Sequence, residues 1–502
     1  MLNCTTVVRV VALLAFLFAE SPHSLLAQTS TLTCTSKDGQ RQHCPANTST
    51  GVILQRSLGP AECMLGKTWG YDDDGVWVTG GCSGEFVLGQ ATAATTPATQ
   101  EEQPIETWGA VEPGKGFLVG RTQFGDLYIS AYALVRYLNQ LPPDQTFEDH
   151  LGVVREIDTR NDIYSHRVMV FFKGWMGLQK LRYQIILWTV NTTDQKAIFA
   201  SLGYQFSKRF SVYAGLNALP GTRSLQGSHP YWLGNDRVLA DEFFRPYFTN
   251  GAWVSGEIVP GLWYNAMVGN NNSALGITAK QLTRDLATGG SMWWMPTTKE
   301  FGPQGAFGDF ENHERLATRF GFSTTRSRED RFSNVFSGSP DNTTLRLADS
   351  LNLFDLGSLA PGVTVQQANF RVLAVDAGMK YRGIFLQTEI YHRWLDGFEA
   401  DGPLPVNRIV DKGLYVQGAF YPIPRKLELY GATSQIFGDK DAGFSNANEY
   451  LGGANVYLAN SRNYRLNFQV IRVKRSPVSS TFGYYVGGQT GPIVTAALSI
   501  FF

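Results

Sequence analysis

From residue 126 onward, apolar and polar residues alternate with a period of two in many segments of about ten residues. In residues 463–470, every second side chain is apolar and those between are polar, and residues 180–187 repeat the pattern. Successive side chains of a β-strand point to opposite faces, so each segment presents one apolar and one polar face. Tilted strands of about ten residues are long enough to cross a lipid bilayer. The pattern therefore predicts strands with lipid on one face and water on the other.

The connections between these segments alternate between short and long. Short joins are predicted at 173–179, 207–208, 260–261, 382–383, 422–425 and 460–462. Longer, more polar segments separate them at 138–161, 218–246, 270–287, 326–368, 396–411, 435–448 and 474–490. Two joins break the rule, because 191–195 is short for a long loop and 297–315 is long for a short turn. A soluble sandwich also alternates in polarity, but turns at one end and long loops at the other are typical of outer-membrane barrels.

The alternation continues to the last residue, Phe502, in a strand that is apolar on one face. Such a strand is an aggregation hazard unless both of its edges are paired, which a closed barrel guarantees. We therefore predict an all-β fold, in which a small disulfide-bonded domain precedes a transmembrane antiparallel barrel of about sixteen strands. An even strand number puts both ends of the barrel at its short-turn, periplasmic end, and a barrel of this size leaves an aqueous channel.

The residues before the barrel carry a different pattern. Arg9 precedes an apolar run that ends at Ala19, which is typical of a secretory signal. No later segment has the roughly 20 apolar residues of a membrane helix, so the sequence argues against a helical membrane protein. We expect the barrel in the outer membrane of a Gram-negative bacterium and the N-terminal domain in the periplasm. The predicted parts are a signal peptide (1–27), a small Cys-containing domain (28–90), a linker (91–110) and the barrel (111–502).

Four cysteines, Cys34, Cys44, Cys63 and Cys82, lie in the Cys-containing domain. In an exported chain this set predicts two disulfides, and three connectivities are open. We favour pairing neighbours, Cys34 with Cys44 and Cys63 with Cys82. The spacing lacks the paired C-x-x-C of a zinc site, and the acidic stretch 71–78 lacks the further ligands of a calcium loop. No metal site is predicted.

Composition narrows the classes of function. Lys plus Arg (43) equals Asp plus Glu (43), so there is no charge excess for binding nucleic acid. No G-x-S-x-G motif occurs, and His166 has no serine-rich nucleophile turn beside it. We expect neither an enzyme nor a cofactor.

Basic residues lie on the predicted polar faces and in residues 236–246. Arginine binds phosphate and carboxylate well, because its planar donors are fixed and its charge persists. The alternative is that these side chains pair with acidic ones across the wall and only stabilise it. The acidic counterparts are Asp376, Glu389 and Glu428. The residues predicted to line the pore or bind anions are Arg136, Arg167, Arg182, Arg237, Arg245, Arg319, Lys380 and Arg465.

Two stretches resemble a known family: DRVLADEFFRPYFTNGAWVSGEIVPGLWYNAMVGNN at 236–271 and FGDFENHERLATRFGFSTTRSREDRF at 307–332. They resemble the phosphate-selective porin O and P family of Gram-negative outer membranes, and the likeness covers the barrel to its end. The resemblance implies a sixteen-stranded, typically homotrimeric channel whose loops fold into the lumen and whose arginines and lysines guide anions. It also implies that Phe502 is a signal read by the assembly machinery.

Residues 236–246 are our choice for a loop folded into the lumen. Arg237 and Arg245 flank Asp241 and Glu242, beside two phenylalanines suited to anchoring the loop to the wall. A surface loop held by the same ion pairs is the alternative.

Residues 34–86 are similar to a small Cys-containing domain family of exported bacterial proteins without a settled function. The likeness rests on the four cysteines and on the Trp69-Gly70-Tyr71 and Gly81-Cys82 elements. A periplasmic position suits contact with the cell wall or a glycan. The leading hypothesis is thus a porin for small hydrophilic solutes, with a preference for anions or phosphate. The runner-up is a non-transport barrel that tethers the outer membrane to the cell wall or acts as an adhesin.

Overall fold

The chain divides into two compact units, residues 1–103 and 104–502. The expected signal peptide and linker lie outside the described residues. No helix in the described part of the chain is long and apolar enough to cross a membrane. The computed structural model describes residues 30–37, 40–48, 52–59, 61–65, 67–72, 74–88, 111–112, 115–189, 196–227, 229–273, 282–330, 345–479 and 483–502.

Two three-stranded antiparallel sheets build the first unit. Val76, Val78 and Phe86 are fully buried in its core, and the rings of Trp69 and Phe86 lie 4.9 Å apart. In the acidic stretch 71–78, Tyr71 pairs with Val76 and Asp72 with Gly75 on neighbouring antiparallel strands. The first sheet has the order β1 (Ser30–Thr35), β6 (Ser83–Leu88), β3 (Val52–Ser57), and the second β2 (Gln42–Pro45), β5 (Gly75–Val78), β4 (Trp69–Asp72).

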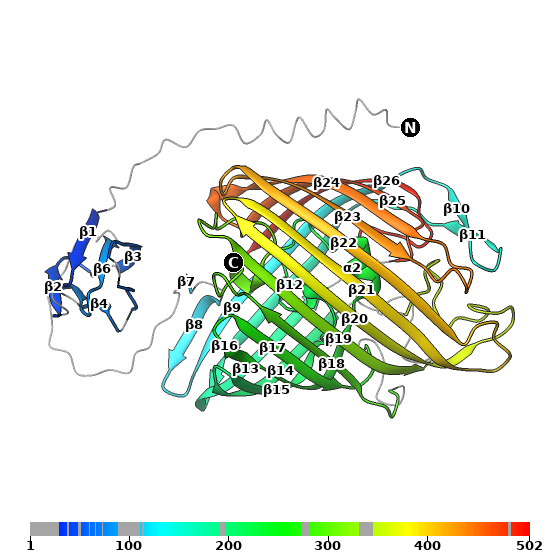
Figure 1. Ribbon diagram of the computed structural model, residues 1–502, viewed down its shortest axis with the longest axis horizontal. Coiled ribbons are helices and arrows are strands. Elements are labelled where there is room, and N and C mark those ends of the chain that lie inside the picture. The colour runs from blue at the N-terminus through cyan, green and yellow to red at the C-terminus, as the bar shows by residue number, and fades with distance from the viewer. Residues whose placement is uncertain are drawn as a thin grey trace. The chain divides into compact units, whose positions relative to one another are not determined.

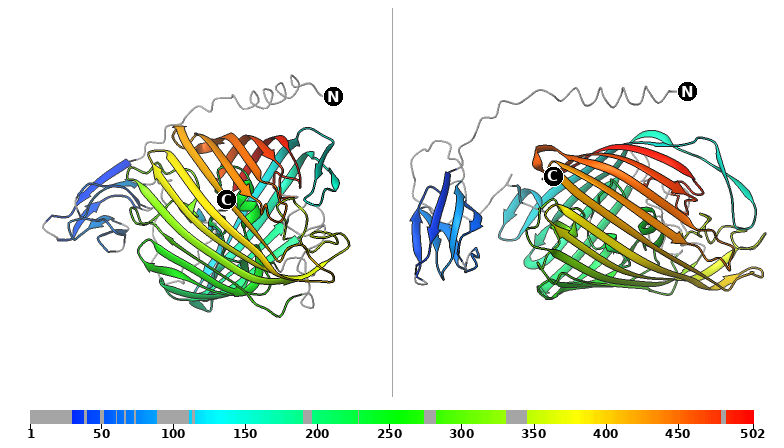
Figure 2. Two further views of the ribbon diagram at one scale, coloured as in Figure 1. Left: turned by 45° about the vertical axis from the view of Figure 1, so that its right-hand side comes forward. Right: turned by 45° about the horizontal axis from the view of Figure 1, so that its top comes forward.

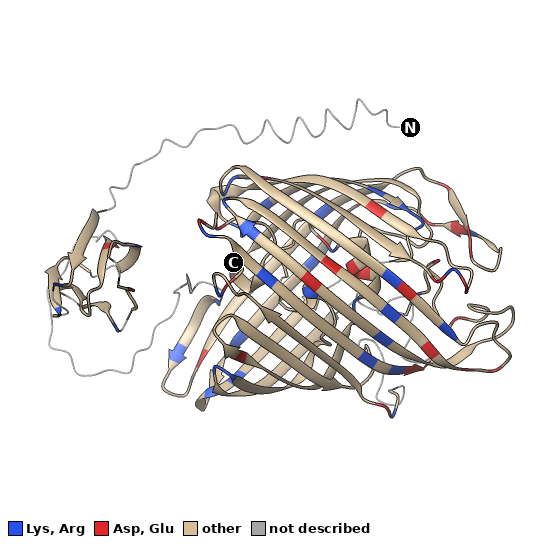
Figure 3. Ribbon diagram, in the orientation of Figure 1, with Lys and Arg blue, Asp and Glu red and all other residues tan. Residues whose placement is uncertain are grey.

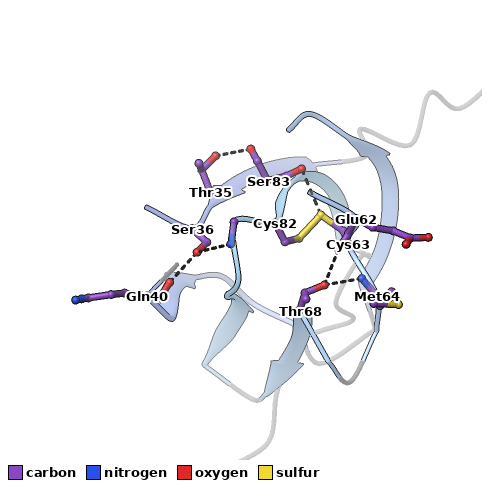
Figure 4. The surroundings of a disulfide bond; sticks show 10 residues. Thr35, Ser36, Gln40, Glu62, Cys63, Met64, Thr68, Cys82 and Ser83 are labelled. Carbon is purple, nitrogen blue, oxygen red and sulfur yellow. Dashed lines mark hydrogen bonds between the residues drawn. A yellow bond between two sulfur atoms is a disulfide. The ribbon is translucent and has the colours of Figure 1, made fainter. Parts of the chain in front are cut away.

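Two disulfides close this small core, as predicted. The structure pairs Cys34 with Cys44 and Cys63 with Cys82. Beside the second bridge, the hydroxyl of Thr68 accepts a hydrogen bond from a backbone N–H and donates one to a backbone carbonyl (Figure 4). A unit this small buries little apolar surface, and a disulfide typically adds about 2–4 kcal/mol to such a fold.

Sixteen antiparallel strands in the described residues close the second unit into a barrel (Figure 1). Each strand pairs with its neighbours in the chain, and β9 closes the ring because it pairs with both β12 and β26. The strands run obliquely around the barrel (Figure 2), as closure requires. They are β9 (Gly125–Gln140), β12 (Asn161–Met176), β13 (Leu178–Thr189), β14 (Lys196–Ser207), β15 (Phe210–Ala218), β16 (Phe248–Val259), β17 (Leu262–Gly269), β18 (Ala287–Trp294), β19 (Ala317–Asp330), β20 (Val365–Tyr381), β21 (Ile384–Ala400), β22 (Arg408–Ile423), β23 (Leu427–Phe437), β24 (Ala447–Tyr457), β25 (Tyr464–Lys474) and β26 (Gly491–Phe501).

The terminal strand β26 is paired on both edges, by β25 and β9. The last residue, Phe502, exchanges two backbone hydrogen bonds with Ala131 of β9. The strand that precedes β9 in the chain, β8 (Gly116–Thr122), pairs with the start of β9. Its Phe117 ring lies 5.6 Å from the ring of Phe502, measured between centroids. A short strand, β7 (Val111–Glu112), pairs with β8. The apolar end of the chain is therefore protected in the way its sequence predicts.

The two faces of the barrel wall differ in polarity as the alternation predicts. On β25, Tyr464, Phe468 and Val470 are exposed on the outside, whereas the polar residues Asn467 and Gln469 between them are buried inside. Charged residues occur at intervals along the strands (Figure 3). On β20 and β21, the charged side chains that are buried on the inner face of the wall include Asp376, Lys380, Glu389 and Arg393.

Most connections at one end of the barrel, here called the short-turn end, are short, and most at the other, the long-loop end, are long; the β18–β19 connection at the short-turn end and residues 190–195 at the long-loop end are the exceptions. At Arg382 and Gly383, φ is 48° and 80°, as a tight two-residue hairpin requires. One predicted join is wrong, because β12 continues to Met176 and only Gly177 separates it from β13. Lys173 consequently lies in a strand rather than in a turn. In the long β9–β12 connection, β10 (Gln145–Glu148) and β11 (Val154–Ile157) form a small hairpin.

Candidate functional site

The described residues of the β15–β16 segment, 219–227 and 229–247, lie inside the barrel. It holds the 3-10 turn η1 (Arg223–Leu225) and the helix α2 (Leu239–Phe244), whose six residues are all buried. The ring of Phe244 stacks on Tyr391 of β21, with centroids 4.9 Å apart. The N–H of Leu239 donates to the carboxylate of Glu449 on β24 at 2.9 Å. The helix is thus fixed to the inner wall.

Buried ion pairs hold this segment in place. The guanidinium of Arg245 donates two hydrogen bonds of 2.9 Å to Glu242, and Arg237 lies 3.8 Å from the same carboxylate. Arg167 of β12 donates to both carboxylate oxygens of Asp236, at 3.1 and 3.2 Å. Residues 236–246 therefore form the inward loop chosen from the sequence rather than the alternative surface loop, and internal ion pairs hold them there.

The β18–β19 segment, residues 295–316, enters the lumen from the short-turn end. Phe301 and Phe307 are buried, and the ammonium of Lys380 donates to the carbonyls of Phe301 and Ala306 at 2.8 Å each. The N–H of Phe307 donates to the carbonyl of Tyr231, so this segment meets the β15–β16 segment inside the barrel. A join that is unusually long for a short-turn position is explained by this inward path.

Together the two segments fill the lumen against strands β20 to β25, which we call the packed half. Arg465 of β25 donates to the carbonyls of Trp232 and Gly234, at 2.6 and 3.1 Å. Glu389 of β21 accepts a hydrogen bond of 2.8 Å from the N–H of Arg223. Wall side chains here bind the backbone of the segments and are covered by them.

A cavity of about 810 Å³ remains against β9 and β12 to β16, which we call the hollow half, and Lys115, just before β8, also lines it. The strands form one of its walls and the β15–β16 segment forms the other. Arg182 lies near the short-turn end of β13 and Trp188 near its long-loop end, and both line the cavity. At about 3.4 Å per residue, these two positions are roughly 20 Å apart along the strand. The cavity therefore follows about half of the length of β13, and its volume is typical of a solute site.

Basic side chains dominate the charge of this cavity. Its described lining holds five basic residues, Lys115, Arg167, Lys173, Arg182 and Arg237, and one acidic residue, Asp126. Asp126 accepts a hydrogen bond of 3.0 Å from the N–H of Trp175. Burial, reinforced by Arg167 and Arg237, lowers the pKa of His229 well below its usual value, so the ring is neutral at pH 7. The cavity presents a positive potential to a solute.

Three of the eight predicted basic residues, Arg167, Arg182 and Arg237, line the cavity. The other five lie elsewhere inside the barrel, and in the structure each is engaged by a protein group. Anion binding by these five remains a prediction. Arg136 donates to the Gly483 carbonyl, Arg245 to Glu242, Arg319 to Asp376, Lys380 to two carbonyls of the β18–β19 segment, and Arg465 to two of the β15–β16 segment.

Two basic residues of the lining, Lys115 and Lys173, and a group of aromatic residues are missing from the sequence-based set. The basic set consists of Lys115, Lys173 and Arg182, of which only Arg182 is predicted, because Lys173 was assigned to a turn. Continuing the alternation of β12 to Trp175 would have placed Lys173 inward. The aromatic set consists of Trp188, Phe199 and Phe248, whose ring centroids lie 5.0 to 6.4 Å apart.

A compact charge network closes the short-turn end of the β18–β19 segment. Ligand atoms of Asp309, Glu311 and His313 all lie within 4.8 Å of one another. These atoms already bind protein groups, since His313 contacts Asp309 and Glu300, and Glu311 lies 2.8 Å from Arg462. Hydrogen bonds to Asp309 and Glu300 raise the pKa of His313 to about 9. The network is an anchor for the segment, and its charges are mutually compensated.

Comparisons with known proteins give one family match. The model of a family described as "Protein of unknown function (DUF3011)" matches residues 31–103. No curated protein matches the chain.

The solved structures that resemble the barrel include OmpT of Vibrio cholerae, with 10% identity and a TM-score of 0.46 over 76% of this chain and 99% of that one. An anion-selective porin from Comamonas acidovorans has 12% identity and a TM-score of 0.42, covering 75% and 99%. The outer-membrane channel DcaP of Acinetobacter baumannii has 10% identity and a TM-score of 0.45, covering 76% and 98%. Likenesses this weak add nothing to the geometry of the present chain.

Proposed function

We propose that this chain is an outer-membrane channel through which small hydrophilic solutes diffuse passively, anions in preference to cations. The observation that carries the proposal is the cavity, which follows β13 inside a closed barrel. The outer face of the same barrel exposes apolar side chains such as Ile185, Ile198 and Phe468. A closed barrel pairs its backbone groups strand to strand, so this outer face suits contact with lipid.

The preference for anions rests on the charge of the cavity. Of the five basic residues in the described lining, Arg167 is paired with Asp236 and Arg237 with Glu242, so the preference rests on Lys115, Lys173 and Arg182, although the whole chain carries balanced charge. Charges inside a narrow, poorly solvated space act on a passing ion more strongly than charges on the surface. The resemblance of residues 236–271 and 307–332 to the phosphate-selective porin O and P family supports the same preference and makes phosphate a candidate solute.

Placement of the parts follows from the strand number. With sixteen strands, both ends of the barrel lie at the short-turn end, which faces the periplasm in outer-membrane barrels. The Cys-containing domain, residues 28–90, would then lie in the periplasm, where its disulfides persist. Contact with the cell wall or a glycan suits this position, and co-sedimentation of the purified domain with peptidoglycan tests it. The family resemblance further supports a homotrimer, which cross-linking in detergent tests.

Planar-bilayer recording of the purified chain tests the channel directly. We expect stepwise currents. In a gradient of potassium chloride, we expect the reversal potential to lie closer to the equilibrium potential of chloride than to that of potassium. A channel without anion preference would refute the selectivity and leave the channel intact. A silent protein would favour the runner-up, a barrel acting as a tether or adhesin, which the filling of the packed half also suits.

A further inference from the structure

The cavity of the hollow half combines two kinds of side chain that a simple ion path does not need together. The aromatic set gathers near the long-loop end, where Trp188 and Phe199 present rings 5.8 Å apart and Phe248 lies 5.0 Å from Phe199. Further aromatic faces continue along the wall. Tyr213 of β15 and Trp253 of β16 stack with their centroids 5.6 Å apart. Aromatic surface thus extends from one end of the cavity into its middle.

The basic set lies toward the opposite end. Lys173 and Arg182 sit near the short-turn ends of β12 and β13, and Phe171, two positions before Lys173, faces the same cavity. The ammonium of Lys115 lies 4.9 Å from the ring centroid of Tyr128. Basic groups and aromatic faces are therefore neighbours at this end, and a solute meets both.

Solute classes differ in how many of these features they use. A cation is repelled by the basic lining, and a neutral sugar gains nothing from it. Inorganic phosphate uses the positive charges and leaves the aromatic faces in contact with water. An anion that carries an aromatic ring uses both, because its ring stacks or packs edge to face on the aromatic side chains while its carboxylate is drawn toward the basic set.

We propose that the preferred solutes of this channel are aromatic carboxylates, which move along the aromatic faces of β13 to β16 toward Lys115, Lys173 and Arg182. The inference rests on the channel function proposed above and names its solute class. The affinity resides in the hollow half, since the wall residues of the packed half are covered by the inward segments.

Block of the chloride current in planar bilayers measures the affinity of each probe for the full chain. Four probes are compared: benzoate, cyclohexanecarboxylate, benzyl alcohol and inorganic phosphate. Cyclohexanecarboxylate keeps the charge but has a ring without π electrons, and benzyl alcohol keeps the aromatic ring but has no charge. A favourable aromatic contact corresponds to up to about tenfold in affinity. We expect benzoate to block at about tenfold lower concentration than cyclohexanecarboxylate or phosphate, and benzyl alcohol to block least. Equal block by benzoate and cyclohexanecarboxylate, or tighter block by phosphate, would overturn the proposal while the channel itself stands.

Variants locate the effect. Trp188→Leu should bring the ratio of benzoate to cyclohexanecarboxylate affinity toward one, and Phe248→Leu provides the same test on a second strand should the first variant fail to fold. Arg182→Gln should weaken block by both carboxylates and leave their ratio unchanged. Arg209→Gln, an identical exchange at an exposed turn, is the matched control and should change neither. An unchanged ratio in the aromatic variants overturns the inference, whereas the absence of any current in the unaltered protein overturns the proposed function instead.

Discussion

The packed and hollow halves of the lumen use the same residue types to opposite effect. Against β20 to β25, Arg393 donates to Asp411 at 2.6 Å, and both side chains are almost completely buried. Against β13, Arg182 is only partly buried and lines a cavity, and no ion pair is described for it. In the packed half an inward arginine such as Arg393 anchors structure, whereas in the hollow half Arg182 meets solute and Arg167 lines the cavity while it is paired with Asp236. The alternation of a strand does not distinguish the two situations.

This difference changes which variants test selectivity. Arg237 and Arg245 are attractive targets from the sequence, since both flank the loop expected in the lumen. In the structure both contact Glu242, so their joint replacement leaves a buried carboxylate without its partners. Such a change costs several kcal/mol and alters the loop itself. Arg182 offers the cleaner test, because its loss removes charge from the cavity without breaking a described ion pair.

The largest expected effect comes from exchanging arginine for glutamine once in each half. Arg393→Gln should lower the free energy of unfolding by about 3–5 kcal/mol, because it leaves the Asp411 carboxylate buried without a counter-charge. Arg182→Gln should change it by less than about 1 kcal/mol. Urea titration of the barrel in detergent, followed by gel mobility, measures both. Similar losses in the two variants would remove the distinction between the halves.

Two adjacent positions on β13 sharpen the assignment of the hollow half. Ile185 is 39% exposed on the outer face, and Gln184 lines the cavity. Ile185→Arg should destabilise the barrel by about 2–4 kcal/mol, because it places a charge against lipid. Gln184→Arg should assemble normally and strengthen the anion preference. Heat-modified migration and reversal potentials report the two outcomes, and equal assembly defects would contradict the inside-outside assignment.

The β18–β19 segment provides a pH test of the packed half. The pKa of His313 is raised to about 9 by hydrogen bonds to Asp309 and Glu300. The stabilisation of the folded segment by protonated His313 is therefore fully present below about pH 6.5, the usual pKa of histidine. It is lost as the pH rises through about 9. We expect larger and noisier currents at pH 10 than at pH 7, because the segment loosens. His313→Gln should abolish this pH dependence, and persistence of the change in that variant would assign it to other groups.

Salt dependence gives the smallest effect. Screening shortens the reach of charges from about 10 Å at 0.1 M salt to about 3 Å at 1 M. The anion preference set by Lys115, Lys173 and Arg182 should therefore be strong at low salt and weaken at 1 M. The stability difference between Arg393→Gln and the unaltered protein should change little over the same range, since that pair is buried. A preference that does not depend on salt would argue for a size filter.

Much of the architecture was predictable because its causes are local. The strand alternation, the turn at 382–383 and the protected terminal strand follow from the two-residue period and from local turn chemistry. The two disulfides follow from four cysteines in a chain whose sequence predicts a secretory signal. The sequence predicts a turn at 173–179, but the turn consists of Gly177 alone and β12 continues to Met176. For the same reason the sequence does not predict the inward position of Lys173.

The sequence by itself determined which side chains point into the barrel, and only the tertiary structure decided which of them a solute meets. Gln469 and Gln184 are equally inward by alternation. Gln469 accepts a hydrogen bond of 2.7 Å from the Tyr430 hydroxyl and is buried, whereas Gln184 lines the cavity. The physical reason is that the lumen is filled by segments far away in the chain, through contacts such as that of Phe244 with Tyr391. A period of two records the local direction of a side chain and carries no information about what lies opposite it.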